Sequence, residues 1–161
     1  MMKLRILVGL FLIGVVNFSA LAADKINVTD AYARATFAMA TTGAVYLTLQ
    51  NHSSEQRTLT SVSVDKSLAD DAQIHTTQMM GEMVKMREVK EGVKLPSHQN
   101  VSFMPGGHHI MLLGLNRPLK EGESINLTLL FDNGATKDIR ATIRKTNGKD
   151  SQAEHHSHAH H

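Results

Sequence analysis

The sequence predicts an all-β domain, a sandwich or barrel of about eight or nine short strands. Apolar and polar residues alternate with a period of two in short stretches along most of the chain, and this is the pattern of half-buried strands. Turn-forming residues separate these stretches at intervals of roughly 8–12 residues, as they do in all-β sandwiches. No stretch shows sustained helical periodicity, so we expect fewer than two helices.

The clearest strand is predicted at residues 43–50, where three aliphatic residues fall on one face and Ala44, Tyr46 and Thr48 on the other. Residues 66–72 are polar and could hold one helical turn at most. The remaining strands are predicted at residues 26–36, 57–64, 72–76, 84–89, 100–104, 109–113, 125–129 and 139–143, with a short piece between residues 92 and 96.

Three turns separate these strands most clearly. Asn51-His52-Ser53-Ser54 has turn chemistry, and Asp132-Asn133-Gly134 predicts a hairpin before the last strand. Pro105-Gly106-Gly107 predicts a sharp loop that leads directly into the strand at residues 109–113. We therefore expect that strand to begin at the rim of the fold.

The first 22 residues have the features of a secretory signal peptide. Lys3 and Arg5 precede an apolar run at residues 6–16, and Ala20-Leu21-Ala22 fits a small-residue cleavage site. We expect cleavage after Ala22, an exported domain at residues 23–148 and no stable membrane insertion afterwards. Because the segment holds two basic residues and no acidic ones, the rest of the chain is near neutral, which argues against a nucleic-acid partner.

The chain has no cysteine among its 161 residues. Disulfides are therefore excluded, and one domain of this length must take its stability from its core. Any site for a soft metal must be built from imidazole and thioether groups. An electron-transfer copper site of the type that uses a cysteine thiolate is also excluded.

Imidazole and thioether side chains gather between residues 75 and 111. Thioethers favour Cu(I) and imidazoles suit several first-row metals, so the mixture indicates copper before zinc or iron. His109 and Met111 lie two residues apart on one strand and would point the same way. The alternative is that Met111 belongs to the core and His109 is a polar neighbour. His75 and Met86 lie on other strands, and their spacing alone does not bring them together.

Three further methionines lie between these strands. Gly81 interrupts the cluster of Met79, Met80 and Met83, so we expect a mobile loop there. The alternative is a hydrophobic turn packed on the end of the sandwich, because methionine is a common filler of apolar gaps.

Three segments resemble the periplasmic copper chaperones of the PCu(A)C family. They are Arg34-Ala35-Thr36 with Thr42-Gly43-Ala44-Val45-Tyr46-Leu47-Thr48-Leu49-Gln50-Asn51, Ile74-His75 with Gly81-Glu82-Met83-Val84-Lys85-Met86-Arg87, and Pro105-Gly106-Gly107-His108-His109-Ile110-Met111-Leu112-Leu113-Gly114-Leu115. The resemblance extends over residues 28–144. It implies a cupredoxin-like Greek-key β-sandwich that carries Cu(I) towards the dinuclear copper centre of cytochrome c oxidase. The implied partner is a copper-accepting oxidase subunit or a second copper-assembly protein.

The resemblance also implies the copper ligands. The family motif is a histidine, ten residues, a methionine, twenty-one residues and then His-x-Met. His75 and Met86 have the required spacing, and the twenty-one residues after Met86 end at Gly107, so the motif's second histidine would fall on His108. Only His109, however, is followed by a methionine at the correct position, Met111. We favour His109 because it shares a strand face with Met111, and we place the extra residue in the turn at residues 90–96.

The function predicted from these residues is non-enzymatic transport of Cu(I) by a periplasmic monomer. Two neutral imidazoles and two neutral thioethers would leave the ion with a charge of +1, and no thiolate would hold it against transfer. One alternative is a secreted copper-buffering or copper-resistance protein without a dedicated recipient. Another is an adhesion-type sandwich in which these residues are structural. An enzyme is the weakest alternative, because no nucleophile–base pair or phosphate loop is visible.

The C-terminal segment, residues 149–161, is a low-complexity tail with five of the ten histidines. We expect it to be disordered and to bind Cu(II) or Zn(II) as an accessory site, although a purification tag is the alternative. Truncation at Gly148 should lower the Cu(II) stoichiometry, and an unchanged stoichiometry would remove this hypothesis.

Overall fold

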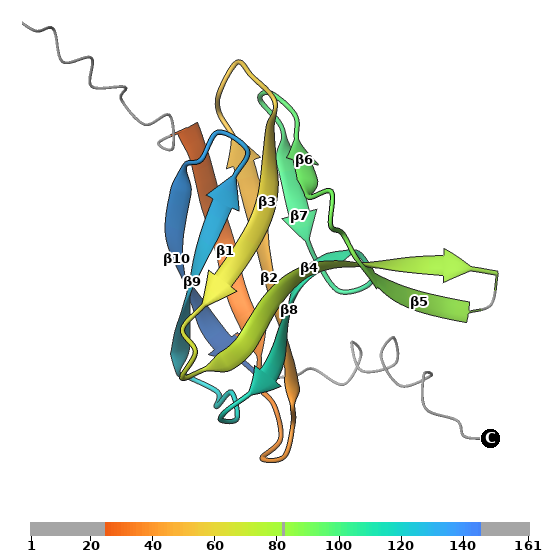
Figure 1. Ribbon diagram of the computed structural model, residues 1–161, viewed down its shortest axis with the longest axis vertical. Helices are drawn as coiled ribbons and strands as arrows, with labels where there is room; N and C mark the ends of the chain where they lie inside the picture. The colour runs from red at the N-terminus through yellow and green to blue at the C-terminus, as the bar shows by residue number, and fades with distance from the viewer. Residues whose placement is uncertain (1–24, 82, 146–161) are drawn as a thin grey trace, which may run out of the picture.

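The computed structural model describes residues 25–81 and 83–145, which form ten strands (Figure 1). The signal peptide and the His-rich tail that the sequence predicts lie outside these residues. Within them, no helix is long and apolar enough to cross a membrane. The strands are β1 (Ile26–Arg34), β2 (Thr42–Asn51), β3 (Arg57–Val64), β4 (Ala69–Met80), β5 (Met83–Glu88), β6 (Val93–Leu95), β7 (Asn100–Phe103), β8 (His108–Leu115), β9 (Ser124–Phe131) and β10 (Thr136–Arg144).

The strands form one continuous hydrogen-bonded path in the order β5-β4-β8-β2-β1-β10-β9-β3-β6, and β7 pairs with β2 outside this path. β1 and β10 run parallel, although they come from opposite ends of the domain, while the other pairs are antiparallel. β3 also contacts β4 near the other end of the path. The sheet therefore curls back on itself and encloses the core between its two halves (Figure 1).

The core is built by the alternation that the sequence displays. On β2, Val45, Leu47 and Leu49 are almost fully buried, and on β8 Ile110 and Leu112 are completely buried. The all-β prediction is confirmed, with ten strands in place of eight or nine among the described residues. The additional strand is β6, the short piece between residues 92 and 96, which pairs with β3.

β2 changes its partner halfway along one edge. Ala44 and Val45 pair with Met111 and Ile110 of β8, whereas Leu47 pairs with Phe103 of β7. The sheet splits at this point, where the predicted loop at residues 105–107 connects β7 to β8. The split brings the start of β8 beside the middle of β2. Tyr46 lies between Val45, which pairs with β8, and Leu47, which pairs with β7.

Two local predictions are wrong. The strand predicted at residues 72–76 runs from Ala69 to Met80 and forms an antiparallel hairpin with β5 that projects from the body (Figure 1). Met79, Met80 and Met83 are thus exposed strand residues, neither in a loop nor packed against the sandwich. The pairing continues to Met80 opposite Met83, and Gly81 follows with a positive φ of 66°, which glycine tolerates readily.

The region at residues 90–96 is also more ordered than a simple turn. Val93 and Leu95 of β6 point into the core and are 5% and 0% exposed. An extra residue in β6 would turn these side chains outward. Gly92 is buried against Leu59 and Thr60 of β3, so the exposed Lys90 and Glu91 are the part of this region where an insertion would disturb packing least.

Candidate metal centre

The pairing of β4 with β8 places His75 directly opposite His109. The two imidazole ring centroids lie 5.9 Å apart, with an angle of 44° between the ring planes. Directly opposed residues of an antiparallel pair project from the same face of the sheet. Two imidazoles separated by 33 residues in sequence therefore meet on the outer face, away from the core side chains of both strands.

The two candidate thioethers lie on the same face, on either side of this histidine pair. Met111 is two residues beyond His109 and pairs with Gln73, while Met86 pairs with Thr77, two residues beyond His75 in the other direction. Met111 is half-buried and Met86 is 38% exposed. The structure brings the imidazoles together and places one thioether along the sheet on each side of them.

His108 lies on the opposite face. It shares that face with Ile110, and its ring centroid is 5.6 Å from that of the buried Phe103. His108 pairs with Thr76, whose side chain is also buried. The strand face thus separates His108 from the set formed by His75, His109 and their two methionine neighbours.

The tautomer of His75 is set by a short polar chain on β4. The Gln73 amide donates to Asp71 Oδ2 at 2.9 Å, and Gln73 Oε1 lies 3.0 Å from His75 Nε2. Since a carbonyl oxygen can only accept, Nε2 carries the hydrogen and Nδ1 carries the lone pair. Nδ1 of His75 is buried and has no hydrogen-bond partner, and the same holds for Nδ1 of His108 on the opposite face. A buried polar atom of this kind calls for an explanation, and a ligand nitrogen is one.

The tautomer of His109 is set in the opposite sense. Its Nδ1 lies 3.2 Å from the backbone oxygen of Gly107 and must donate to it, so the lone pair of the neutral ring is on Nε2. The same carbonyl accepts the Thr77 backbone N–H at 3.1 Å, which ties the loop to β4. The ring of His109 is thereby fixed by the loop that precedes its strand.

An aromatic and cationic wall covers the other side of His109. Tyr46 of β2 lies 6.4 Å from His109 and 5.3 Å from Tyr32, measured between ring centroids. The guanidinium carbon of Arg34 lies 5.1 Å from the Tyr46 ring centroid, and that of Arg144 lies 4.5 Å from the Tyr32 centroid. His109, Tyr46 and Arg34 are each less than 8% exposed. The wall restricts the imidazole to one position and places positive charge near the site.

Burial lowers the pKa of His75 below its usual value, and the nearby Glu88 carboxylate opposes this shift. A lowered pKa keeps the imidazole neutral over a wider pH range, and only the neutral ring can bind a metal. No group of three or more His, Cys, Asp or Glu residues suited to a metal lies within residues 25–81 and 83–145. The candidate set therefore depends on thioether sulfur to complete it.

Sequence reasoning missed Gln73, Tyr46 and Arg34 as parts of this site. The signal for Gln73 was available, because a residue two positions before a histidine on a strand shares its face. Tyr46 was correctly placed on the outer face of β2 but was not connected with His109. The contact between Tyr46 and His109 depends on where β2 changes its partner from β8 to β7, and no local sequence pattern marks that point.

Replacing Gln73 with leucine is expected to lower Cu(I) affinity by about tenfold, because residues that orient a ligand imidazole typically contribute 10–100-fold. The change removes the acceptor that holds the hydrogen on Nε2 of His75. Competition with a Cu(I) chelator measures the affinity. Gln78→Leu is the matched control, since Gln78 is exposed on the opposite face of β4. An equal loss in both variants would contradict the role of Gln73.

The metal-free protein is expected to lose stability as the pH falls below about 6.5. Burial lowers the pKa of both His75 and His108 from 6.5 in the folded protein. Between these lowered values and 6.5 the unfolded chain binds more protons, so the free energy of unfolding rises with pH in that window. Urea unfolding at several pH values measures it. The His75→Gln/His108→Gln variant should show a weaker pH dependence, and an equal dependence would contradict this origin.

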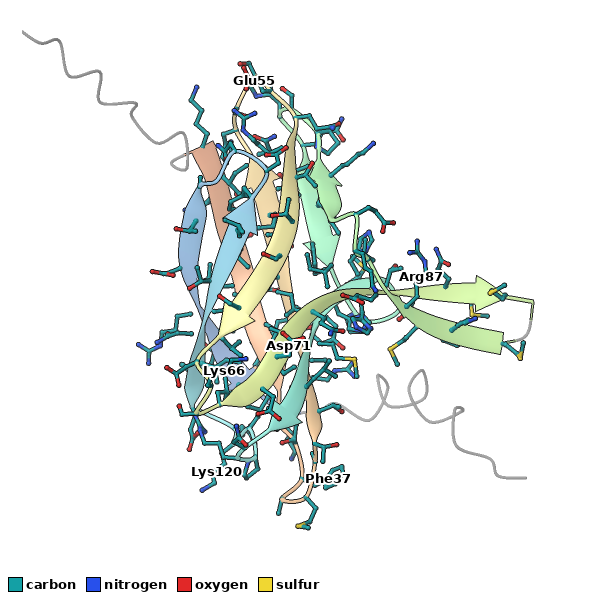
Figure 2. All side chains as sticks on the ribbon, in the orientation of Figure 1. Phe37, Glu55, Lys66, Asp71, Arg87 and Lys120 are labelled. Carbon is teal, nitrogen blue, oxygen red and sulfur yellow. The ribbon has the colours of Figure 1, made fainter. Side chains whose placement is uncertain are left out.

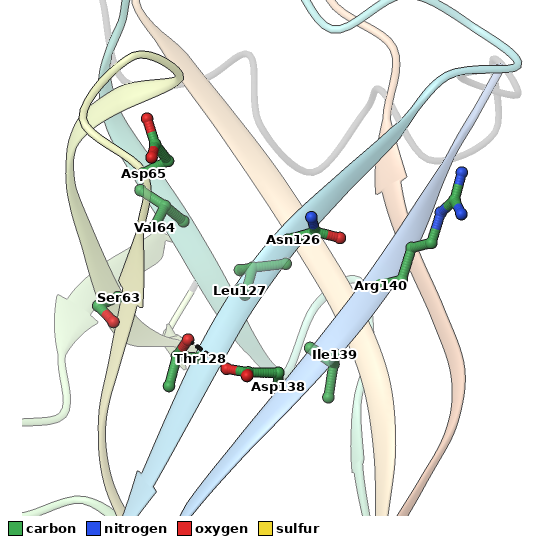
Figure 3. A pocket seen from close by; sticks show the side chains of 9 residues that line it. All are labelled: Ser63, Val64, Asp65, Asn126, Leu127, Thr128, Asp138, Ile139 and Arg140. Atoms are coloured by element: carbon green, nitrogen blue, oxygen red, sulfur yellow. Dashed lines mark hydrogen bonds between the residues drawn. The ribbon is translucent and has the colours of Figure 1, made fainter.

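A hollow among the described residues lies on β3, β9 and β10 and is lined by none of the histidines (Figure 3). Thr128 donates a hydrogen bond of 2.6 Å to Asp138 across its floor. Its open position and the internal pairing of these polar groups give no sign of a ligand site. The chemistry concentrated on β4, β5 and β8 remains the candidate centre.

The fold matches solved structures of copper-binding domains. The PCuAC domain described as the apo form from PmoF1 matches with a TM-score of 0.62 and 24% identity, over 76% of this chain and 95% of that chain. Apo-DR1885 from Deinococcus radiodurans matches with a TM-score of 0.59 and 28% identity, over 91% and 95%. The Cu(I) form of DR1885 matches with a TM-score of 0.58 and 30% identity, over 81% and 84%.

Sequence comparison identifies the family. A curated relative, "Putative lipoprotein Lxx21020" of Leifsonia xyli subsp. xyli, is 34% identical over 87 residues, which are 54% of this chain. The matched region is 52% of that relative, so the match spans about half of its length. The family model "Putative lipoprotein LpqE-like" matches residues 26–143, which include every described strand except the last residue of β10. This chain belongs to the LpqE-like family and has the fold of PCuAC domains.

Proposed function

We propose that this chain is an exported, monomeric Cu(I) carrier whose ligands are His75, Met86, His109 and Met111. One observation carries the proposal: the β4–β8 register sets His75 opposite His109, with rings 5.9 Å apart. Met86 and Met111 flank that pair on the same face. The Cu(I)-bound form of DR1885, 30% identical to this chain, supports the choice of metal.

The ligand chemistry favours a carrier over a resident cofactor. Thioether and imidazole groups suit Cu(I), and all four are neutral, so the bound ion keeps its charge of +1. Arg34 is buried in the wall beside His109. Its guanidinium packs over the Tyr46 ring that neighbours His109. The exposed position of Met86 leaves one ligand accessible to a recipient.

An anaerobic Cu(I) titration of a form truncated at Gly148 tests the site without the tail. We expect one tightly bound ion per chain and an X-ray absorption spectrum with two nitrogen and two sulfur neighbours. A spectrum with nitrogen or oxygen neighbours alone would overturn the ligand set. Failure to bind Cu(I) would instead support a sandwich in which these residues are structural.

The proposed recipient is a soluble copper-accepting domain of a cytochrome c oxidase subunit, or a second copper-assembly protein. Mixing the Cu(I)-loaded chain with such an apo domain should move copper faster than the ion dissociates into a chelator. A copper-buffering protein without a recipient should instead lose copper to the apo domain no faster than it loses copper to the chelator. Export to the periplasm by a cleaved signal peptide, and accessory Cu(II) binding by the tail, remain parts of this proposal.

A further inference from the structure

The β4–β5 hairpin exposes four methionines that its packing does not explain. Met79, Met80 and Met83 are 70%, 58% and 73% exposed, and Met86 is 38% exposed. Figure 2 shows sulfur atoms spread along this projecting hairpin. Side chains so exposed bury little apolar surface and contribute little to folding. Their thioether sulfurs, in contrast, are available to a soft metal ion.

Strand alternation divides these methionines between two faces. Met80 and Met83 pair directly at the tip and project from the face that continues the core side of β4. Met79 pairs with Val84 and Met86 pairs with Thr77, and both pairs lie on the face that carries His75. Met86 is therefore diagonal to Met79 on one side and to His75 on the other, at a typical Cα separation of about 7–8 Å.

The charges on the hairpin differ between the two faces. Lys85 and Arg87 alternate with Met86 and so lie on the face away from His75. Glu88 pairs with His75 on the site face, 3.7 Å from the ammonium of Lys90. Arg87 is paired in turn with Glu91 at 3.6 Å. The two basic residues therefore disfavour a cation on the Met80 and Met83 face only modestly, whereas the Met79 and Met86 face carries the Glu88 carboxylate.

We propose that Met79 and Met86 form an outer thioether site through which Cu(I) enters and leaves the centre at His75 and His109. This inference rests on the proposed function and adds the path by which the ion reaches and leaves the centre. Met86 is the shared ligand, because its three rotatable side-chain bonds let its sulfur reach either neighbour. Copper moves outward when a bond from Met79 Sδ forms, the bonds to the two imidazoles and to Met111 Sδ break, and the bond to Met86 Sδ is kept. The copper remains Cu(I), both thioethers remain neutral, and no proton or electron is transferred.

Transfer kinetics of the purified protein test the route. The chain is loaded with one equivalent of Cu(I) under anaerobic conditions and mixed with excess bicinchoninate, and the release rate is followed by absorbance. Met79→Leu should slow release by about fivefold, a barrier increase of about 1 kcal/mol, with its equilibrium Cu(I) affinity within twofold of the parent chain. Met80→Leu is the matched control, because it changes the same side chain at the adjacent exposed position on the opposite face.

Methyl NMR of methionine gives a second readout on the parent chain. Substoichiometric Ag(I), a redox-inert soft cation, should broaden the Met79 methyl resonance and leave that of Met80 sharp. Equal release rates in the two variants, or equal broadening of the two methyl groups, would overturn the outer site. A parent chain that takes up no Cu(I) in the anaerobic loading step would instead refute the proposed function, so the two failures are distinguishable.

Discussion

Replacing His109 with alanine is expected to lower the affinity for Cu(I) by at least about 100-fold, since loss of an orienting residue alone contributes 10–100-fold and His109 is a proposed ligand. The imidazole is held by Gly107 on one side and by the Tyr46 wall on the other. No other histidine on β8 projects from the same face. Chelator competition measures the affinity, and circular dichroism checks the fold.

His108→Ala is the matched control for this prediction. It removes the same side chain at the adjacent position, but from the face that stacks on Phe103. We expect its Cu(I) affinity to stay within about threefold of the parent chain, a change of roughly 0.6 kcal/mol. A larger loss from His108→Ala than from His109→Ala would reverse the assignment. His109→Gln, which retains more of the volume, separates loss of the ligand from loss of packing.

Alternation along single strands is the part of this protein that the sequence predicts well. It correctly places Ile110 and Leu112 on one face of β8 and His109 and Met111 on the other, because a period of two follows from backbone geometry alone. It left open which of the two faces belongs to the core. The pairing of His75 with His109, in contrast, does not follow from alternation along a single strand. Register between strands depends on packing of the whole sheet, so only the family resemblance pointed to that meeting.

The β4–β5 hairpin shows where strands cannot be predicted from apolar–polar alternation. Beyond Thr77 both faces of the hairpin leave the body, so burial no longer imposes an apolar–polar alternation on residues 78–81 and 83–86. The polar and thioether side chains there look like a loop when they are read in sequence. Pairing from His75 opposite Glu88 to Met80 opposite Met83 stabilises them as strands nonetheless. The same exposure makes their sulfurs available for the proposed outer site.

Replacing Ile110 with alanine is expected to lower the free energy of unfolding by about 2–5 kcal/mol, the usual cost of an Ile-to-Ala change in a core. Ile110 is completely buried and lies between its cross-strand partners Val45 and Ile74, themselves 0% and 3% exposed. Few rearrangements could fill the cavity, because both neighbours are fixed in paired strands. Urea unfolding of the metal-free protein measures the change.

Met111→Ala provides the opposite case one position along the same strand. Met111 is half-buried on the outer face beside Ala44 and Gln73, so its truncation should cost less than about 1.5 kcal/mol of stability by lost apolar burial. It should nevertheless weaken Cu(I) binding strongly, whereas folded Ile110→Ala should bind Cu(I) with nearly the parent affinity. If Met111→Ala instead unfolds the domain and Ile110→Ala abolishes binding, the two faces of β8 have the reverse of the roles proposed for them. Of these two adjacent residues on β8, Ile110 would thus stabilise the sandwich and Met111 would bind the metal.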